Sequence, residues 1–157
     1  MQNWREALEI AQDRIALERD LVNMLTPRVV EFLPPQLALG DGKSAISDWI
    51  KERKDAARIY TVRMPQSKEL QGLLFLMDQN DGKTNAFSIG YMFKEAAWGH
   101  GYASELVAGV IAQSQHVTLR GGVAKGNDAS VRVLIKNGFQ VREDVSTADV
   151  TMFERHL

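Results

Sequence analysis

The order of hydrophobic patterns along the chain predicts an α+β fold with one central sheet. Three short strand-like segments separated by turn residues follow one another, which is typical of an antiparallel meander. A strand–helix–strand order comes after them, and helical patterns flank both parts. We therefore expect a single mixed, largely antiparallel central sheet with helices on both faces.

The N-terminal part is expected to be helical. In residues 3–25 the apolar side chains lie mostly three or four positions apart. The main stripe is Trp4, Leu8, Ala11, Ile15, Val22 and Leu25, and Ala7, Leu17 and Leu21 widen it. Thr26-Pro27 then predicts the cap and first residue of a new helical turn, which Pro34-Pro35 ends.

A glycine-rich loop and another helix come next. The glycines within residues 36–43 indicate a loop. Ser44 is the expected cap of a helix over residues 44–55 whose apolar side chains face inward. We interpret the charged run 51–54 in this helix as a solvated face rather than a binding patch.

The remaining elements are predicted from hydrophobic periodicity and turn residues. We expect strands over 58–64, 70–78, 86–93 and 117–124, turns over 65–67 and 80–83, a helix over 127–137 closed by Gly138, and a hairpin of 139–143 and 150–155. A helix before the fourth strand is predicted by a continuous apolar stripe of Ala103, Leu106, Val107, Val110 and Ile111.

Length and composition narrow the function classes. The 157 residues, 45% of them hydrophobic, suit one compact domain spanning 1–157. A net charge of −1 gives no basic field for nucleic acid. The chain has no cysteine, no signal peptide and no apolar run long enough for a membrane span, so we expect a soluble, cytoplasmic protein.

A glycine turn precedes the predicted central helix. Residues 99–103, GHGYA, leave little side chain over the first helical turn, so several backbone amides are open to a ligand. The positive end of the helix dipole lies at the same place, which suits a pyrophosphate. A tight connection without a ligand explains the same residues equally well.

Two motifs resemble a known family. WGHGYA, residues 98–103, followed by an amphipathic helix, resembles the acetyl-CoA signature Q/R-x-x-G-x-G/A of the GNAT superfamily of N-acetyltransferases, with Trp98 where glutamine or arginine is usual. IGY at 89–91 is similar to the branch of ribosomal-protein N-terminal (alanine/serine) acetyltransferases. Asn127, Ser130 and residues 132–139, RVLIKNGF, are similar to a second motif of that branch, N-x-x-S-x-R-V-L-x-K-x-G-F.

The resemblance implies the GNAT acyl-CoA N-acyltransferase fold and an enzyme that transfers acetyl from acetyl-CoA to a primary amine. That amine is expected to be the α-amine of a protein N-terminus, a peptide or a small metabolite. The implied cofactor-binding residues are Met92, Phe93, Trp98, Gly99, His100, Gly101, Tyr102, Ala103, Ser104, Asn127 and Ser130.

The resemblance also implies roles for two polar residues. Asn127 would contact the cofactor arm, and Ser130 would meet the departing thiolate, which makes these two the catalytic candidates. Both have an ordinary structural explanation, because asparagine and serine are common at the start of a helix. The family's first strand precedes its first helix, and residues 13–19, DRIALER, are the candidate for its remnant.

The acid and base of the reaction are not evident. Leu134 stands where many members have a tyrosine acid, and Ser88 stands where this branch often has glutamate. Glu95, Asp78 or a water chain are the remaining base candidates. Deprotonating a lysine of pKa ~10.4 at pH 7 costs about 4.6 kcal/mol, against about 1.1 kcal/mol for an α-amine of pKa ~7.8. A site with a weak base therefore favours low-pKa acceptors.

Other functions stay open at this point. The leading alternative is an acetyl-CoA-binding sensor or interaction module without turnover, and a ligand-free interaction domain is a third. Three scattered histidines offer no metal site. The expected partners are acetyl-CoA and an amine acceptor, without nucleic acid or membrane. The acceptor and the oligomeric state cannot be read, and a homodimer is compatible with the sequence.

Overall fold

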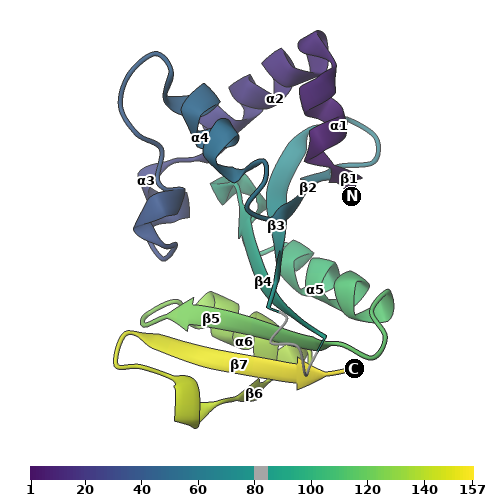
Figure 1. Cartoon of the computed structure of the whole chain (residues 1–157), viewed down its shortest axis with the longest axis vertical. Coiled ribbons are helices and arrows are strands. Elements are labelled where there is room, and N and C mark those ends of the chain that lie inside the picture. The colour runs from purple at the N-terminus through teal and green to yellow at the C-terminus, as the bar shows by residue number, and fades with distance from the viewer. Residues whose placement is uncertain (80–84) are drawn as a thin grey trace. The chain divides into compact units, whose positions relative to one another are not determined.

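The computed structural model contains the predicted mixed sheet (Figure 1). Its seven strands lie in the order β1-β2-β3-β4-β5-β7-β6. β4 and β5 are parallel, whereas the pairs β1–β2, β5–β7 and β6–β7 are antiparallel. The described residues are 1–79 and 85–157, so the turn expected over 80–83 lies outside them.

The chain divides into two compact units. The first unit comprises Met1–Phe75 and Tyr91–Trp98, and the second comprises Leu76–Gly90 and Gly99–Leu157. The strands β3 (Leu70–Asp78) and β4 (Ala86–Phe93) contribute to both units and have the predicted bounds.

The first unit begins with a short strand and is mainly helical. Its other elements are β1 (Gln2–Asn3), α1 (Trp4–Glu9), α2 (Ala11–Met24), α3 (Pro27–Val30), α4 (Ala45–Arg53), β2 (Arg58–Arg63) and the 3-10 helices η1 (Pro35–Leu37) and η2 (Glu95–Ala97). The helix expected over residues 3–25 is two helices, because Ile10 has extended backbone angles between them.

The first strand lies at the very start of the chain. Gln2 pairs with Thr61 and Asn3 with Tyr60 on β2. The expectation that residues 13–19 hold a remnant of this strand is wrong, because they lie inside α2. Asn3 ends β1 and also caps α1, its Oδ1 accepting a hydrogen bond from the Arg5 amide at 3.1 Å.

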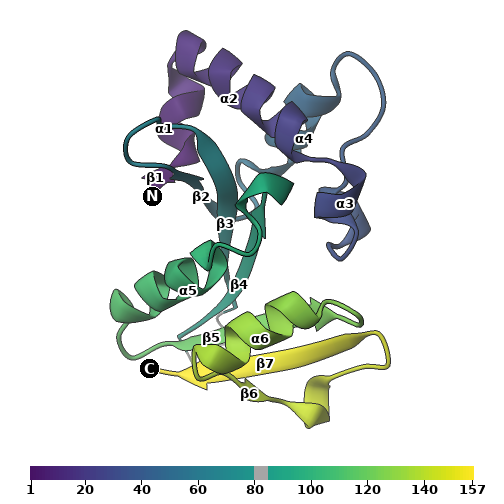
Figure 2. The ribbon, with the colours of Figure 1, turned by 180° about the vertical axis from the view of Figure 1, so that it is seen from behind.

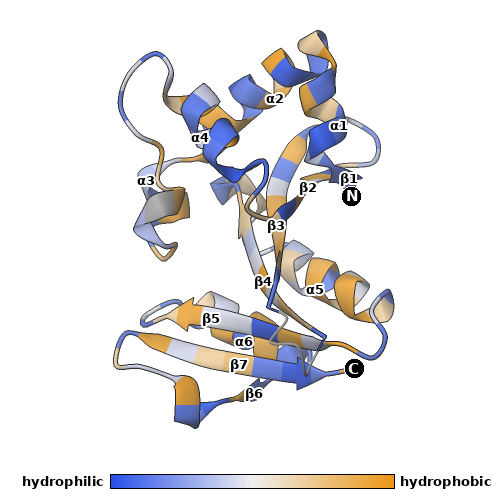
Figure 3. Ribbon diagram, viewed as in Figure 1, coloured by the Kyte–Doolittle hydropathy of each residue, from blue (hydrophilic) through white to orange (hydrophobic). Residues whose placement is uncertain are grey.

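The buried side of α2 differs from the predicted one. Leu17 and Leu21 are completely buried, whereas Ile15 and Val22 are 67% and 48% exposed. Figure 3 shows hydrophobic and hydrophilic residues alternating along this helix. Apolar residues occur on more than one side of α2, so spacing alone selected the wrong stripe. The hydrophobic core of the first unit includes Trp4, Leu17, Leu21, Trp49, Ile59 and Leu73.

Helix α4 differs from the prediction in its cap and in the burial of one charged residue. Ser44 precedes it but makes no capping hydrogen bond, because its backbone is already helical and a capping residue needs an extended one. The helix ends at Arg53, and this residue is buried rather than solvated. Its guanidinium lies 4.4 Å from the centre of the Trp49 ring and donates to the Trp49 carbonyl at 2.8 Å.

The second unit is a helix–strand assembly. Its other elements are α5 (Tyr102–Ala112), β5 (Thr118–Ala124), α6 (Asp128–Lys136), β6 (Gln140–Val141), the 3-10 helix η3 (Glu143–Val145) and β7 (Val150–His156). The predicted central helix and closing hairpin are confirmed, although β6 is shorter than the expected 139–143 and β7 extends one residue beyond the expected 150–155. Figures 1 and 2 show α6 lying alongside β5 and β7. Gly121 on β5 makes room for it, since an added Cβ there would lie 3.2 Å from Leu134 Cδ1.

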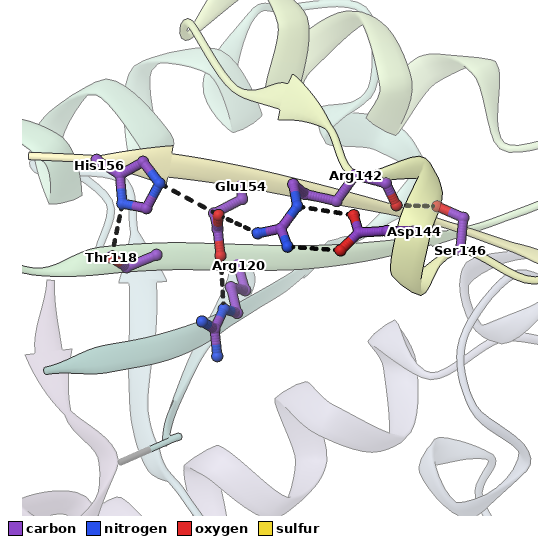
Figure 4. Close-up of polar contacts among 7 residues, drawn as sticks. All are labelled: Thr118, Arg120, Arg142, Asp144, Ser146, Glu154 and His156. Atoms are coloured by element: carbon purple, nitrogen blue, oxygen red, sulfur yellow. Dashed lines mark hydrogen bonds and ion pairs between the residues drawn. The ribbon is translucent and has the colours of Figure 1, made fainter. Parts of the chain in front are cut away.

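An ion-pair network joins β5, β7 and the segment after β6 (Figure 4). Glu154 is 6% exposed and accepts hydrogen bonds from Arg120 at 2.8 Å and from Arg142. His156 Nε2 lies 3.2 Å from the same carboxylate, and Arg142 also pairs with Asp144. Burial raises the pKa of Glu154, but the hydrogen bonds from the two arginines outweigh burial and hold it below its usual range.

Candidate functional site

The predicted anion turn opens onto the start of α5. Gly99 and Gly101 have φ values of 76° and 83°, which few residues other than glycine adopt. No described atom lies within 4 Å of a Cβ added at either glycine, apart from their chain neighbours. Gly101 is the N-cap and makes no side-chain capping hydrogen bond. The first-turn amides therefore lack the usual capping partner and can receive an anion.

The side chains of this turn are exposed or half-buried. His100 is exposed and stacks on Tyr102, with ring centroids 5.5 Å apart and planes 23° from parallel. Ala103 and Ser104 follow in the first turn of α5 and are half-buried. The Ser104 hydroxyl lies 3.2 Å from Asn137 Nδ2, a contact that sequence reasoning missed.

Asn127 and Ser130 lie together at the start of α6. Asn127 is the N-cap, and its Oδ1 accepts from the Ser130 amide at 3.1 Å, so its capping role is confirmed. Among the described residues the half-buried Ser130 hydroxyl has no hydrogen-bond partner, so it can donate to another group. Leu134, one turn further along, is buried.

β5 continues beyond its pairing with β4. The parallel register covers Ala86 to Ser88 on β4 and Thr118 to Arg120 on β5. On its other edge β5 stays paired with β7 as far as Ala124. Ser88 is half-buried, and its hydroxyl cannot replace a carboxylate as a base.

In the first unit, Met92 and Phe93 are both buried, which breaks the alternation of β4. Gly72 on β3 lies against them, since a Cβ there would be 2.3 Å from the Met92 carbonyl oxygen. The Phe93 carbonyl accepts from Trp98 Nε1 at 2.9 Å. Trp98 is 43% exposed, so it belongs to the rim rather than the core.

Glu95 belongs to a cluster that sequence reasoning did not assemble. Its carboxylate accepts from Thr26 Oγ1 and from Arg28 Nη1, both at 2.7 Å. The Arg28 guanidinium also lies 5.5 Å from the centre of the Trp98 ring. Both carboxylate oxygens of Glu95 are therefore already engaged by hydrogen-bond donors of the first unit. The only signal in the sequence was Thr26, which was predicted as a helix cap.

The described residues contain no candidate metal site. Within them, no three or more histidine, aspartate and glutamate side chains gather closely enough to hold a metal ion. Likewise, in the part of the chain that the structure describes, no helix is long and apolar enough to cross a bilayer.

Solved structures with the same fold have low sequence identity to the chain. A spermidine N-acetyltransferase from Vibrio cholerae, in complex with CoA and spermine, matches with a TM-score of 0.70 and 15% identity over 94% of this chain and 91% of that one. A ribosomal L7/L12 α-N-protein acetyltransferase in complex with CoA matches at 0.69 and 18%, over 90% and 87%. A ribosomal-protein-alanine N-acetyltransferase from Brucella melitensis matches at 0.65 and 18%, over 90% and 95%.

These likenesses establish the fold. No curated protein sequence matches the chain significantly. The family model of the acetyltransferase (GNAT) domain, however, matches residues 12–140. This range is most of the chain and includes both motifs. The chain therefore belongs to the GNAT family of acetyltransferases.

Proposed function

We propose that the protein is an acetyl-CoA-dependent N-acetyltransferase whose acceptor is the α-amine of a protein N-terminus, a peptide or a small metabolite. The observation that carries the proposal is the open glycine turn at the start of α5, where Gly99 and Gly101 leave the first-turn amides accessible. Family membership and neighbours with bound CoA support the same cosubstrate. We take residues 1–157 to act as one GNAT domain, in the cytoplasm.

Each group of residues is proposed to bind one part of the cosubstrate. A pyrophosphate would accept hydrogen bonds from the amides of the Gly99–Ser104 turn and gain from the α5 dipole. Backbone groups of Met92 and Phe93 would hold the pantetheine arm. The Ser130 hydroxyl would donate to the departing sulfur, while Asn127 keeps Ser130 in place through its amide. Asn127 would also contact the cofactor arm, as the resemblance to the family implies.

The proposed reaction is direct transfer. The neutral amine nitrogen attacks the thioester carbonyl carbon and forms the amide bond, the carbon–sulfur bond breaks to release the CoA thiolate, and the proton lost by the nitrogen passes to solvent water. Holding the two reactants together supplies much of the acceleration. Ser88 carries no carboxylate, and both oxygens of Glu95 are engaged by Thr26 and Arg28. We therefore assign an acceptor that is partly neutral at pH 7, as an α-amine of pKa ~7.8 is.

A second candidate function is favoured by the serine at position 88, where a carboxylate is expected. If the missing carboxylate means that no proton is removed, the protein would bind acetyl-CoA as a sensor or interaction module without turnover. The two functions share the cosubstrate site and differ only in product formation. Neighbours that acetylate polyamines also make a higher-pKa amine an acceptor to include in the test.

The test is calorimetric titration with acetyl-CoA, followed by product analysis. Gly101→Glu places a carboxylate in the turn and should abolish binding. Gly42→Glu is the matched control, because Gly42 also has a positive φ of 105° and open space around it but lies in a loop of the first unit. Binding lost only in Gly101→Glu, with acetylation of α-amine peptides, supports the enzyme.

Other outcomes separate the candidates. Binding without product on α-amine peptides, lysine peptides and spermidine would support the sensor. Product on lysine or spermidine alone would contradict the α-amine assignment. No binding by the wild-type protein would overturn both functions.

A further inference from the structure

Asn137 connects the two helices of the second unit. It is 9% exposed and lies at the C-terminus of α6, whereas Ser104 lies in the first turn of α5. Its Nδ2 is 3.2 Å from Ser104 Oγ and 2.8 Å from the Val133 carbonyl oxygen. One buried amide nitrogen thus contacts a residue of the proposed pyrophosphate turn and the backbone of the neighbouring helix.

The contact with Val133 fixes the orientation of the amide. A carbonyl oxygen can only accept a hydrogen bond, so the atom facing Val133 must be the NH₂ group. The same NH₂ group faces Ser104, which means that the serine oxygen accepts. Ser104 then keeps its own hydroxyl proton for a different partner. Among the described residues, Asn137 is the only side chain that hydrogen-bonds this hydroxyl.

Asn137 is itself held firmly. Its backbone amide donates to the Val133 and Leu134 carbonyls at 3.2 and 3.1 Å, and its carbonyl accepts from Arg155. The arginine lies against Gly138, where an added Cβ would be 2.7 Å from Arg155 Nη1. The side-chain amide therefore starts from a fixed backbone and can fix the hydroxyl in turn.

We propose that Asn137 is a positioning residue that holds the Ser104 hydroxyl so that it donates to the pyrophosphate of acetyl-CoA. This inference rests on the proposed function of the α5 turn. Without the amide, the hydroxyl would be free to turn and donate back to a carbonyl of its own helix, as serines in helices do. Asn137 would then act on the ligand only through Ser104.

The test is a double-mutant cycle on CoA binding, measured by calorimetry. Ser104→Ala removes a hydrogen bond to a charged group and should weaken binding about 10-fold or more. Asn137→Ala should weaken it by a smaller factor, roughly 3- to 10-fold. In the Ser104→Ala background, Asn137→Ala should cause no further loss, since its effect passes through the missing hydroxyl.

A truncated ligand separates positioning from general support. The S-acetyl thioester of pantetheine lacks the pyrophosphate, so its binding should be equal in all four proteins. Thermal unfolding of each protein measures the structural cost of losing the Val133 contact. If Asn137→Ala does not fold, Asn137→Asp takes its place, because a carboxylate of the same shape can only accept and would draw the Ser104 proton away from the ligand.

The outcomes distinguish this inference from the proposed function. Additive losses in the cycle, or equal weakening of both ligands by Asn137→Ala, would overturn the positioning role while the enzyme assignment stands. Wild-type protein that binds neither ligand would instead overturn the proposed function.

Discussion

Replacing Gly72 with alanine should damage the first unit more than its small size suggests. The added Cβ would lie 2.3 Å from the Met92 carbonyl oxygen and 2.8 Å from Phe93 Cδ1. Ordinary contacts begin near 3.4 Å, so the backbone of β4 must move by about 1 Å. Overpacking of this kind costs about 1–3 kcal/mol, and a backbone obstacle places Gly72→Ala near the upper end. The alanine also reduces the entropy of the unfolded chain, which offsets about 0.4–1 kcal/mol of this cost.

The expected net loss is about 2 kcal/mol, which lowers Tm by roughly 4–8 °C for a chain of this size. Urea and thermal unfolding measure it directly. Acetyl-CoA affinity should fall as well, because the displaced carbonyl belongs to the strand proposed to hold pantetheine. Gly109→Ala is the matched control, since nothing lies within 4 Å of its added Cβ and alanine favours a helix.

Two results would refute this reasoning about Gly72. One is a Gly72→Ala protein as stable as wild type. The other is recovery of stability when Phe93→Leu is added, because removing the ring leaves the Met92 carbonyl obstacle in place. Recovery would mean that the side chain and not the backbone sets the cost.

Three further predictions concern charged residues. Glu154→Gln should be less stable than wild type in urea at pH 7, and the difference should shrink as pH falls through the lowered pKa of Glu154, where the wild-type carboxylate is protonated. Arg53→Ala should cost about 1–2 kcal/mol in the same assay, through lost packing on Trp49, whereas exposed Lys51→Ala should change stability by less than about 0.5 kcal/mol. Glu95→Gln should leave kcat/KM for an α-amine peptide close to the wild-type value; a loss of about 100-fold or more would identify Glu95 as the base.

Much of the fold could be predicted from hydrophobic periodicity and from the turn residues between elements. β3 and β4 have the expected bounds, because each is an apolar run between turn residues. β1 could not be foreseen, since it consists of two polar residues whose pairing with β2 depends on the folded unit. Arg53 was misjudged although it follows Trp49 by one helical turn, a spacing that allows the guanidinium to cover the ring.

The site was predictable where it depends on local backbone and not where it depends on distant contacts. The glycine turn and the Asn127 cap are encoded within a few residues, so both were recognised in the sequence. The bond between Asn137 and Ser104 joins positions 33 residues apart, and Thr26 and Glu95 are separated by 69. Such pairs require the packing of whole elements, which a single sequence does not reveal.

The Glu95 cluster also bears on the choice of acceptor. Of the two carboxylates considered as bases, Glu95 is already engaged, since one of its oxygens accepts from Thr26 and the other from Arg28. A lysine acceptor would need about 4.6 kcal/mol to become neutral at pH 7. The α-amine needs only about 1.1 kcal/mol, which solvent can provide through the neutral fraction already present. The engaged carboxylate and the serine on β4 therefore both support the α-amine acceptor that we propose.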